Sequence, residues 1–553
     1  MLEPMPRRCG ARTPALLASF ALSAQSAAAR AEPLVADRAP YTVRAAAAPE
    51  NSVAPDGARP EYVLVIALDG VSWNAFRRER SSAPHLSALA RAGFARPAES
   101  VFPSMTWSAH VSMVTGQHPR HHGILGNRWL ERGAKLVYPY LAAPADEWRR
   151  ARTPSLFELA AAKGLATAAL NWPATQGSKL IPYNLPETME SARLTYELMS
   201  PALRAVVERM HARDGRKKDL PKDYLPTLLG RIAKSEGVET DLFVRDLTVE
   251  LVAPRRAGGG RGVAPKVPRL LFTHLLSPDT WLHQYGTPAW VERWGLELID
   301  GMIGHILRAY RRAGVWKKTA VFVVADHGFV EISHAFDLKQ LLVDEGFGPG
   351  RVPPSGLPKG GVGVLFNGHT GYVYARGSGR DKLPKLVRLL RGSTTRGCVH
   401  GLYVPAEYRR LGLPVPPDDE NAGGAPPGEH PGAPDLLVLL RPHCIFAEGH
   451  PRGQLVRPHK AWRIGYHGFL PREPRLLSVF IGAGAGIKRQ RRPLPRCGVV
   501  DLAPTVGHLL GLTWPARWPG REDPFQLDGR VLRDVLSHPT GEPRSSPRRT
   551  PAD

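Results

Sequence analysis

Seven side chains of the kinds that hold divalent metals or attack phosphorus stand where strand-like runs of this 553-residue chain end. Three are carboxylates, three are imidazoles and one is a hydroxyl. They are Asp69, Thr106, Asp279, His283, Asp326, His327 and His467. Such groups, converging at the carboxyl ends of parallel strands, suit two divalent metals with the hydroxyl as nucleophile. The pattern predicts a two-metal phosphoryl or sulfuryl transferase.

The flanking residues indicate how these side chains come together. Asp69 ends the apolar run YVLVIALDG, and Asp326 ends TAVFVVADHG. Asp279 follows RLLFTHLLSPD, with His283 one helical turn further on, and His467 lies in GYHGF just before RLLSVFIG. Residues four apart share one face of a helix, and the carboxyl ends of parallel strands meet at one edge of a sheet. We therefore expect segments far apart in the sequence to meet at that edge.

The rest of the chain alternates strand-like with helix-like segments. Strands are expected at 62–68, 165–173, 269–276, 319–325 and 476–481, and helices at 84–94, 155–163, 240–252, 291–312 and 501–511. Repeated strand–helix units imply an α/β fold with a mostly parallel central sheet and helices on both faces. The pattern does not give the order of the strands.

The N-terminus has the features of a secretory signal. Arg7, Arg8 and Arg12 precede the apolar stretch ALLASFALSA and a run of small residues, with cleavage expected near Ala29 or Ala31. We therefore expect an exported protein, periplasmic or secreted, and no later stretch is long enough for a transmembrane anchor. The predicted parts are a signal peptide (1–31), a flexible linker (32–58), a catalytic domain (59–537) with insertions at about 175–238 and 335–460, and a disordered tail (538–553).

The amino-acid composition limits the kinds of ligand that the chain is expected to bind. Lys and Arg number 74 against 50 Asp and Glu, a net charge of +24 that attracts nucleotides, phosphorylated polymers or anionic lipid headgroups. Because the chain is also rich in Ala, Gly and Pro and its basic runs are short, we favour a genome that uses Arg often as the cause of the charge, with a dedicated basic patch as the alternative. We expect a small phosphate ester, a nucleotide or similar, as partner and no specific nucleic acid. The oligomeric state is left open.

Cysteine usage permits one crosslink. Cys9 would leave with the signal, so Cys398, Cys444 and Cys497 allow one disulfide and one free thiol, with the pair undetermined. The chain has no C-x-x-C motif, which disfavours a structural zinc cluster. The sulfatase pattern Cys/Ser-x-Pro-x-Arg is also missing.

The stretch AESVFPSMTWSAHVSMVTGQHPRHHGILGN resembles the nucleophile segment of the ectonucleotide pyrophosphatase/phosphodiesterase family, within the alkaline phosphatase superfamily. Family members usually have Pro-Asn where this chain has Ser108 and Ala109. Further matches keep the family's order from about Tyr62 to about Leu512. They are LDGVSWNAF, NWPATQG, IPYNLPE, SPDTWLHQYG, VVADHGF, HGFLPREPRLLSVFIGAGAGIK and VVDLAPTVGHLLGL.

The resemblance implies an alkaline-phosphatase-like fold and a division of the ligands between two metals. One metal would take Asp279, His283 and His467. The other would take Asp69, Asp326, His327 and the oxygen of Thr106. Mixed carboxylate and imidazole ligation favours two zinc ions, with manganese or iron as the alternatives.

By the same resemblance, Thr106 is the catalytic nucleophile. Coordination lowers the pKa of its hydroxyl, and attack on phosphorus gives a phospho-threonine that water hydrolyses. The side chain of Asn127 and the backbone N–H of Trp107 would donate to a non-bridging phosphate oxygen.

Three functions follow from this reading. The first is hydrolysis of phosphodiester or pyrophosphate bonds. The second is phosphomonoester hydrolysis at the same site, which needs an added cation such as Arg128. The third is a catalytically inert metal protein that binds envelope polyanions, although all seven site positions remain chemically competent.

Aromatic and imidazole neighbours of the site receive their own predictions. The rings of Trp107 and Trp129 could stack on a nucleobase or sugar, with core packing the alternative for Trp129. The histidines outside the ligand set are interpreted as structural residues with satisfied hydrogen bonds. They are His110, His121, His122 and His274.

Overall fold

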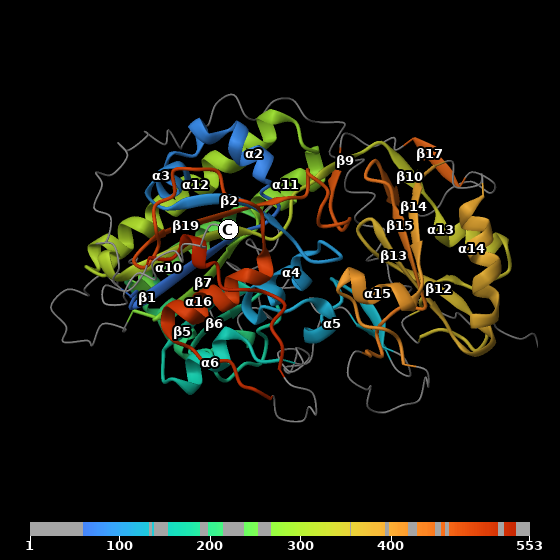
Figure 1. Ribbon diagram of the computed structural model, residues 1–553, viewed down its shortest axis with the longest axis horizontal. Coiled ribbons are helices and arrows are strands. Elements are labelled where there is room, and N and C mark those ends of the chain that lie inside the picture. Colours follow the sequence, from blue (N-terminus) through green and yellow to red (C-terminus); the bar gives the residue numbers. More distant parts are fainter. Residues whose placement is uncertain are drawn as a thin grey trace, which may run out of the picture. The chain divides into compact units, whose positions relative to one another are not determined.

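Eight strands form the central sheet of the computed structural model, in the order β20-β2-β19-β8-β1-β7-β5-β6 (Figure 1). The structure describes residues 59–131, 135–137, 153–187, 197–213, 237–252, 267–353, 356–392, 397–417, 429–447, 455–458, 464–517 and 525–537. The predicted signal peptide, linker and tail lie outside these residues. The strands are β1 (Tyr62–Leu68), β2 (Phe94–Glu99), β5 (Thr167–Trp172), β6 (Tyr183–Pro186), β7 (Leu270–Leu275), β8 (Thr319–Ala325), β19 (Ser478–Gly484) and β20 (Cys497–Gly498).

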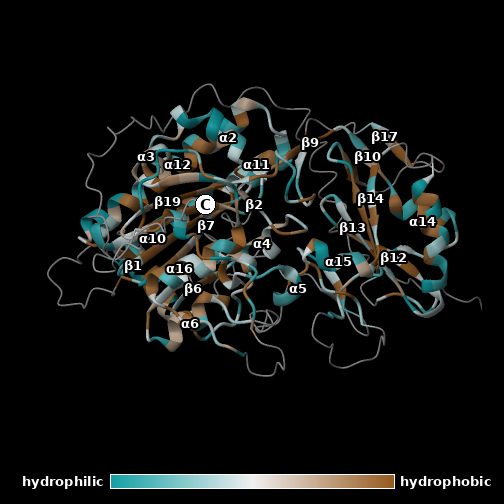
Figure 2. Cartoon of the chain, in the orientation of Figure 1, coloured by the Kyte–Doolittle hydropathy of each residue, from teal (hydrophilic) through white to brown (hydrophobic). Residues whose placement is uncertain are grey.

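The sheet is covered on both faces because its inner strands are apolar throughout. β5, β7 and β8 are buried at every residue, and Figure 2 shows the central strands in hydrophobic colours. Leu64, Ile66 and Leu68 of β1 pack into one core cluster, whereas Val63 and its alternate neighbours pack into another. This two-sided burial is the pattern that a parallel sheet requires. It confirms the predicted α/β fold.

Each face has its own set of helices. One face carries α2 (Trp73–Arg78), α3 (Pro84–Ala92), α8 (Pro201–Arg213), α10 (Val238–Val252) and α12 (Ala289–Arg312). The other carries α4 (Thr106–Thr115), α6 (Leu156–Ala162) and α16 (Leu502–Leu510). Short elements near the site are α5 (Pro119–His122), α11 (Ser277–Tyr285), β3 (Trp129–Glu131) and β4 (Lys135–Val137). A proline stands in the first turn of α3, α5 and α11, where its missing N–H costs nothing.

Two features of the sheet differ from the simple strand–helix pattern. β19 runs antiparallel to both β8 and β2, and β2 was not expected because FARPAE has Arg and Pro in its middle. Arg96 fits there because its buried guanidinium pairs with Asp534 Oδ2 at 3.0 Å. β6 lies within the segment 175–238 that was predicted to be an insertion, so part of that segment belongs to the sheet.

The segment predicted as an insertion at about 335–460 contains a five-stranded sheet of its own, here called the second sheet. Its strands are β11 (Gly350–Arg351), β12 (Val362–Asn367), β13 (Thr370–Ala375), β15 (Leu436–Leu440) and β14 (Val399–Tyr403), in that order. Smaller pairings join β9 (Val330–Ile332) to β18 (Ile464–Tyr466), and β10 (His334–Phe336) to β16 (Cys444–Phe446) and β17 (Val456–Pro458). The accompanying helices are α13 (Leu338–Asp344), α14 (Leu383–Arg391) and α15 (Pro405–Leu411).

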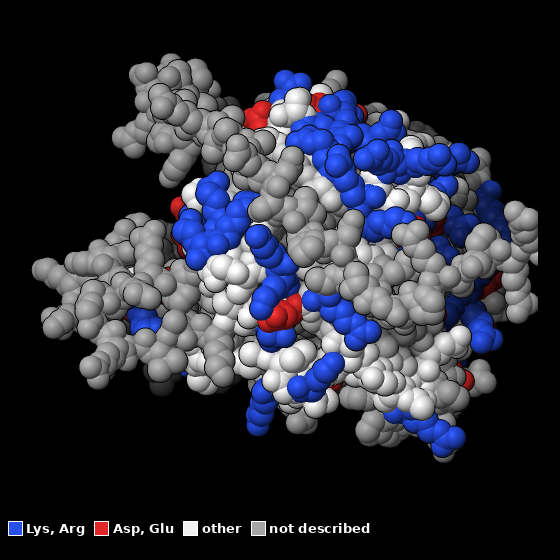
Figure 3. Space-filling view, turned by 60° about the vertical axis from the view of Figure 1, so that its left-hand side comes forward, with Lys and Arg blue, Asp and Glu red and all other residues white. Residues whose placement is uncertain are grey.

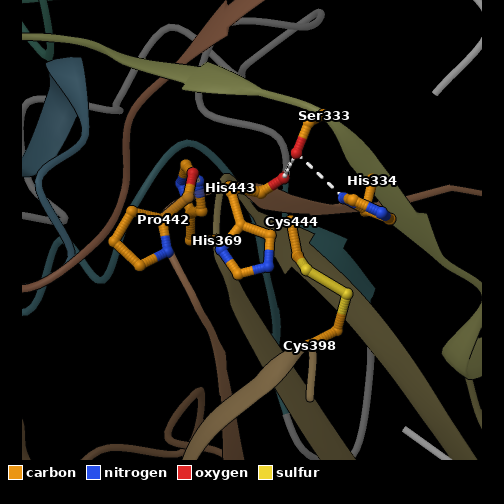
Figure 4. The surroundings of a disulfide bond; sticks show 7 residues. All are labelled: Ser333, His334, His369, Cys398, Pro442, His443 and Cys444. Carbon is orange, nitrogen blue, oxygen red and sulfur yellow. Dashed lines mark hydrogen bonds between the residues drawn. A yellow bond between two sulfur atoms is a disulfide. The ribbon is translucent and has the colours of Figure 1, made fainter. Parts of the chain in front are cut away.

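The structure selects one disulfide among the three candidate cysteines. Cys398, just before β14, is bonded to Cys444 in β16, and Figure 4 shows this bond beside His334 and His443. Cys497 is a free, buried thiol. Within the described residues, no helix has the length and apolar character needed to cross a bilayer.

Candidate active site

The register of the central sheet brings the first two carboxylates together. Leu68 of β1 lies opposite Ala325 of β8, so the next residues, Asp69 and Asp326, leave the sheet side by side. Asp326 Oδ1 accepts hydrogen bonds from the N–H of Gly70 at 3.1 Å and of His327 at 2.9 Å. Gly70 has a φ of 75°, and a Cβ atom there would stand 2.7 Å from the ring of Phe329. The turn after β1 therefore requires glycine.

A second group combines helix α11 with the end of β18. The Asp279 Oδ2 and Oδ1 atoms lie 3.5 Å from His283 Nε2 and 3.6 Å from His467 Nε2. The two Nε2 atoms are only 3.1 Å apart. Each ring donates its Nδ1–H to a carbonyl oxygen, that of Gly465 for His283 and that of Ser104 for His467. Both Nε2 atoms of the neutral rings therefore present lone pairs, which is the arrangement of a metal site.

Asp279 also joins a neighbouring group. One ligand atom from each of Asp69, Asp279 and His327 lies within 4.8 Å of the others, and His327 Nε2 is 3.2 Å from Asp326 Oδ2. Among the described residues, one oxygen atom of each of the three aspartates is buried and has no hydrogen-bond partner. Unpaired buried carboxylates are costly unless a cation neutralises them. The donor set therefore fits bound divalent cations.

Burial has the expected effect on these acids. It raises the pKa of Asp69 and Asp279 well above the usual range, and the charge of Asp326 raises both further. Burial also raises the pKa of Asp326, to about 6. The imidazole pKa values of His327 and His467 are lowered, again chiefly by burial. The lowered imidazole pKa values keep the rings neutral, which is the form that binds a metal, whereas the carboxylates must lose their protons when a metal binds.

Thr106 is the first residue of helix α4, between two contacts that join this helix to the site. Two residues before it, Ser104 accepts the hydrogen bond from His467. Four residues after it, His110 donates from Nδ1 to the Thr106 carbonyl at 2.8 Å and lies 3.7 Å from Asp326 Oδ2. The Thr106 hydroxyl therefore lies at the N-terminus of a helix, where the free backbone N–H groups favour a bound anion.

The turn between β12 and β13, here called the hairpin turn (367–370), contacts both the candidate phosphate site and a candidate metal ligand. Asn367 Oδ1 accepts from the N–H of Asn127 at 3.0 Å and of Arg128 at 3.2 Å. His369 donates from its N–H to the His467 carbonyl at 3.2 Å. A Cβ atom on Gly368 would lie 2.0 Å from that same carbonyl oxygen. The second sheet therefore braces Asn127 and His467 together.

Comparison with known proteins agrees with this geometry. Residues 63–469 match the family model of the type I phosphodiesterases/nucleotide pyrophosphatases. The chain belongs to this family.

Relatives and solved structures extend the comparison. Ectonucleotide pyrophosphatase/phosphodiesterase family member 7 of Rattus norvegicus is 20% identical over 325 residues, 56% of this chain and 62% of that protein. Venom phosphodiesterase 2 of Crotalus adamanteus is 20% identical over 280 residues, 50% of this chain and 28% of that protein. The matched parts thus span less than two thirds of either relative.

The fold comparison covers more of the chain. The structure of murine ectonucleotide pyrophosphatase/phosphodiesterase 5 superposes with a TM-score of 0.56 and 16% identity, covering 86% of this chain and 100% of that one. An inactive threonine-to-alanine variant of the same murine protein, in complex with AMP, superposes with a TM-score of 0.56 and 15% identity over the same shares. These matches confirm the alkaline-phosphatase-like fold.

In this phosphodiesterase-family chain, the structure does not support two of the predicted substrate contacts, the N–H of Trp107 to phosphate and the stacking of the Trp107 and Trp129 rings. The N–H of Trp107 is already used, because it donates to Asn127 Oδ1 at 3.2 Å. The Trp107 side chain is 1% exposed and packs in a hydrophobic cluster with Trp129, which is also 1% exposed. Neither indole offers a face on which a nucleobase could stack. Helix α4 is buried at every position, and local sequence could not reveal that.

Trp107→Ala is therefore expected to act through packing. We expect a loss of about 3–5 kcal/mol in the free energy of unfolding, because a large buried ring leaves a cavity. The value of kcat/KM should fall by the same factor for a nucleotide diester and a small aryl diester. Chemical denaturation and steady-state kinetics measure both effects. A rise in KM confined to the nucleotide would restore the stacking hypothesis.

Two further residues of this family member lie at the site without having been predicted there. His274 of β7 places Nε2 3.1 Å from Asp69 Oδ2 and donates from Nδ1 to the Asn171 carbonyl at 3.0 Å. Asn171 has a φ of 56° at an irregularity in β5, which aims that carbonyl at the ring. His274 is thus a structural histidine, as interpreted, but its partner is a candidate metal ligand. Its signal was a histidine within the apolar run RLLFTHLL.

Glu187 is the second of these residues, directly after β6. Burial, and to a smaller extent the charge of Asp326, raise the pKa of Glu187 to about 8. A hydrogen bond with the Trp107 side chain lowers the pKa by less than these two effects raise it. No described residue bonds its Oε2 atom. The matching motif IPYNLPE contains this glutamate, but its spacing gave no chemical role.

Proposed function

We propose that the chain hydrolyses phosphodiester or pyrophosphate bonds in a nucleotide or a similar small phosphate ester. Two divalent metals and a phospho-threonine intermediate on Thr106 carry the reaction. The main support is the pair of imidazole lone pairs 3.1 Å apart beside Asp279, next to the buried carboxylates of Asp69 and Asp326. A bound cation would give these acceptors a common partner.

The proposed ligands divide as the family resemblance implies. Asp279, His283 and His467 would hold one metal, and Asp69, Asp326, His327 and Thr106 the other, with zinc favoured by the donor types. When bound, the metals supply positive charge that lowers the pKa of the hydroxyl and stabilises developing negative charge on oxygen.

The chain's own residues then supply the nucleophile and its position. Thr106 Oγ1 forms a bond to phosphorus as the bond to the leaving alcohol breaks, and the hydroxyl proton ends on that alcohol. Water then cleaves the phospho-threonine, restoring the hydroxyl and releasing a phosphomonoester. The amide group of Asn127 would donate to a non-bridging oxygen. The inactive threonine variant of the murine relative, in complex with AMP, supports both a threonine nucleophile and a nucleotide ligand.

The runner-up, phosphomonoester hydrolysis, requires a cation for the second negative charge. Arg128 was the candidate, but its Nε donates to the carbonyl of Phe366 in β12. That contact directs the guanidinium toward the second sheet, which favours diesters. The proposed location, periplasmic or secreted, follows from the predicted signal peptide alone.

The deciding experiment compares an aryl phosphodiester with the matched monoester. We expect kcat/KM to be at least about tenfold higher for the diester, because the monoester dianion lacks a partner for its added charge. Arg128→Ala should change this ratio little. A preference for the monoester that Arg128→Ala removes would establish the runner-up instead. Bound metal without turnover of either ester would favour the inert polyanion-binding protein.

A further inference from the structure

A groove lined by none of the candidate metal ligands gathers basic side chains from two segments of the chain. Its volume is about 740 Å³, and it is open on one side. We call it the arginine groove, after six arginines that line it. They are Arg77, Arg80, Arg91, Arg489, Arg491 and Arg492. No acidic side chain lines it, and few are visible among the basic clusters on the face in Figure 3.

The groove has two walls, and both are held by the fold. One wall consists of α2, the short helix η1 (Arg80–Ser82) and α3. The other is the segment 489–492 that follows β19. Gln490 fixes this segment, since its N–H donates to the Gly93 carbonyl at 2.8 Å and its Nε2 donates to the Asp534 carbonyl at 2.7 Å. The two rows of arginines therefore face a shared space without needing a ligand to order the backbone.

These arginines are not used for internal ion pairs. All six are exposed, and within the described residues none has a carboxylate partner. Other arginines of the same region do form ion pairs. Arg78 pairs with Glu292, and Arg293 pairs with Glu79 at 2.9 Å. Guanidinium groups left unpaired on two opposing walls produce a strong local positive potential. They also present forks that match phosphate oxygens.

The floor of the groove is apolar and partly aromatic. Trp73 is half-buried there, beside Ala95, Pro97 and Leu494. The Phe76 ring lies beneath Arg80, whose guanidinium carbon is 5.6 Å from the ring centroid. A ligand that fits must therefore carry several negative charges along its length and flat apolar groups between them.

We propose that the arginine groove binds single-stranded nucleic acid through its phosphate backbone, independently of base sequence, with a base against Trp73. Opposing rows of cations over an aromatic floor are how single strands are held without sequence readout. One mononucleotide or lipid headgroup has too few phosphates for six guanidiniums on two walls. A flat bilayer cannot contact both walls of a concave groove. Because no base-reading contact is required, the binding is non-specific.

The test measures binding without turnover. A short fluorescein-labelled single-stranded oligonucleotide is titrated with full-length Thr106→Ala protein, and anisotropy gives Kd at several salt concentrations. Adding Arg77→Glu and Arg491→Glu, one from each wall, should weaken binding about tenfold or more. The slope of log Kd against log salt should fall by about 1.4, since each lost phosphate contact on a single strand contributes about 0.7. Trp73→Ala, added to the double variant, should weaken binding by a further factor of roughly ten.

A matched control makes the charge change elsewhere. Arg388 and Arg391 on α14 are also exposed, and Arg388→Glu with Arg391→Glu should leave Kd near that of the parent. Equal losses in both double variants, or no loss in either, would overturn the proposal. So would groove variants that lose only binding to anionic phospholipid vesicles, because a membrane would then be the partner. In otherwise wild-type protein the groove variants should keep aryl diester turnover, so failure of the proposed hydrolase function would appear separately.

Discussion

Replacement of Thr106 by alanine is expected to lower kcat on an aryl phosphodiester by at least about 10³-fold. The reason is that in the proposed mechanism the first bond to phosphorus forms from Thr106 Oγ1, and alanine has no atom to replace it. The other candidate ligands stay in place, so metal content should remain at two ions per chain. Stopped assays and elemental analysis of the purified variant measure both quantities.

Thr115→Ala is the matched control, because it removes the same hydroxyl from the far end of helix α4. Thr115 Oγ1 donates to the Val111 carbonyl at 2.8 Å and has no contact with the candidate ligands. Activity should therefore persist, with only a modest loss of stability. Near-normal turnover by Thr106→Ala, with both metals bound, would rule out the covalent route and leave direct attack by water.

Removal of the metals should abolish activity and destabilise the fold. Asp69 and Asp326 are buried and Asp279 lies close to them, so the metal-free protein must either protonate these carboxylates or bear their repulsion. We expect a chelator to eliminate turnover and lower Tm by several degrees, and zinc to restore both. Asp279→Asn should reduce metal content most, because Asp279 belongs to both ligand groups. The exposed Asp381→Asn serves as the control.

The size of the Tm shift should depend on pH. Burial raises the folded-state pKa of Asp326 from 3.8 to about 6. The metal-free folded state therefore binds more protons than the unfolded state between these values, and its stability falls as pH rises through about 6. Metal competes with those protons, so the stabilisation by zinc should increase over the same range. Thermal denaturation at about pH 5 and about pH 8, with and without chelator, tests this. A pH-independent shift would mean that the carboxylates are not ligands.

The part of the site that the sequence predicts follows from the spacing of apolar and polar residues in strands and helices. Apolar runs ending in Asp69 and Asp326 identified two strands of a parallel sheet, whose carboxyl ends share one edge. That these strands are direct neighbours comes from the structure. The spacing of Asp279 and His283 placed both on one face of α11. The structure brings these side chains together, whereas their roles as ligands remain proposals.

The remaining features depend on contacts between distant segments, which local patterns do not encode. The burial of Trp107 follows from packing against the second sheet, and the Cys398–Cys444 pairing follows from the approach of β14 to β16. β2 carries Arg96 and Pro97, so its strand character comes from pairing with β19 and not from propensity. Likewise, nothing in the spacing linked Asn367 to Asn127.

The hairpin turn has a consequence for protein engineering. Because Asn367 holds Asn127 and His369 holds the backbone of His467, the second sheet is not a module that can be exchanged between relatives at its sequence boundaries. A chimaera that imports a foreign sheet would shift the candidate phosphate site and one metal ligand at once. Viable crossover points must keep the turn, the loop around Asn127 and the strand leading to His467 from a single parent.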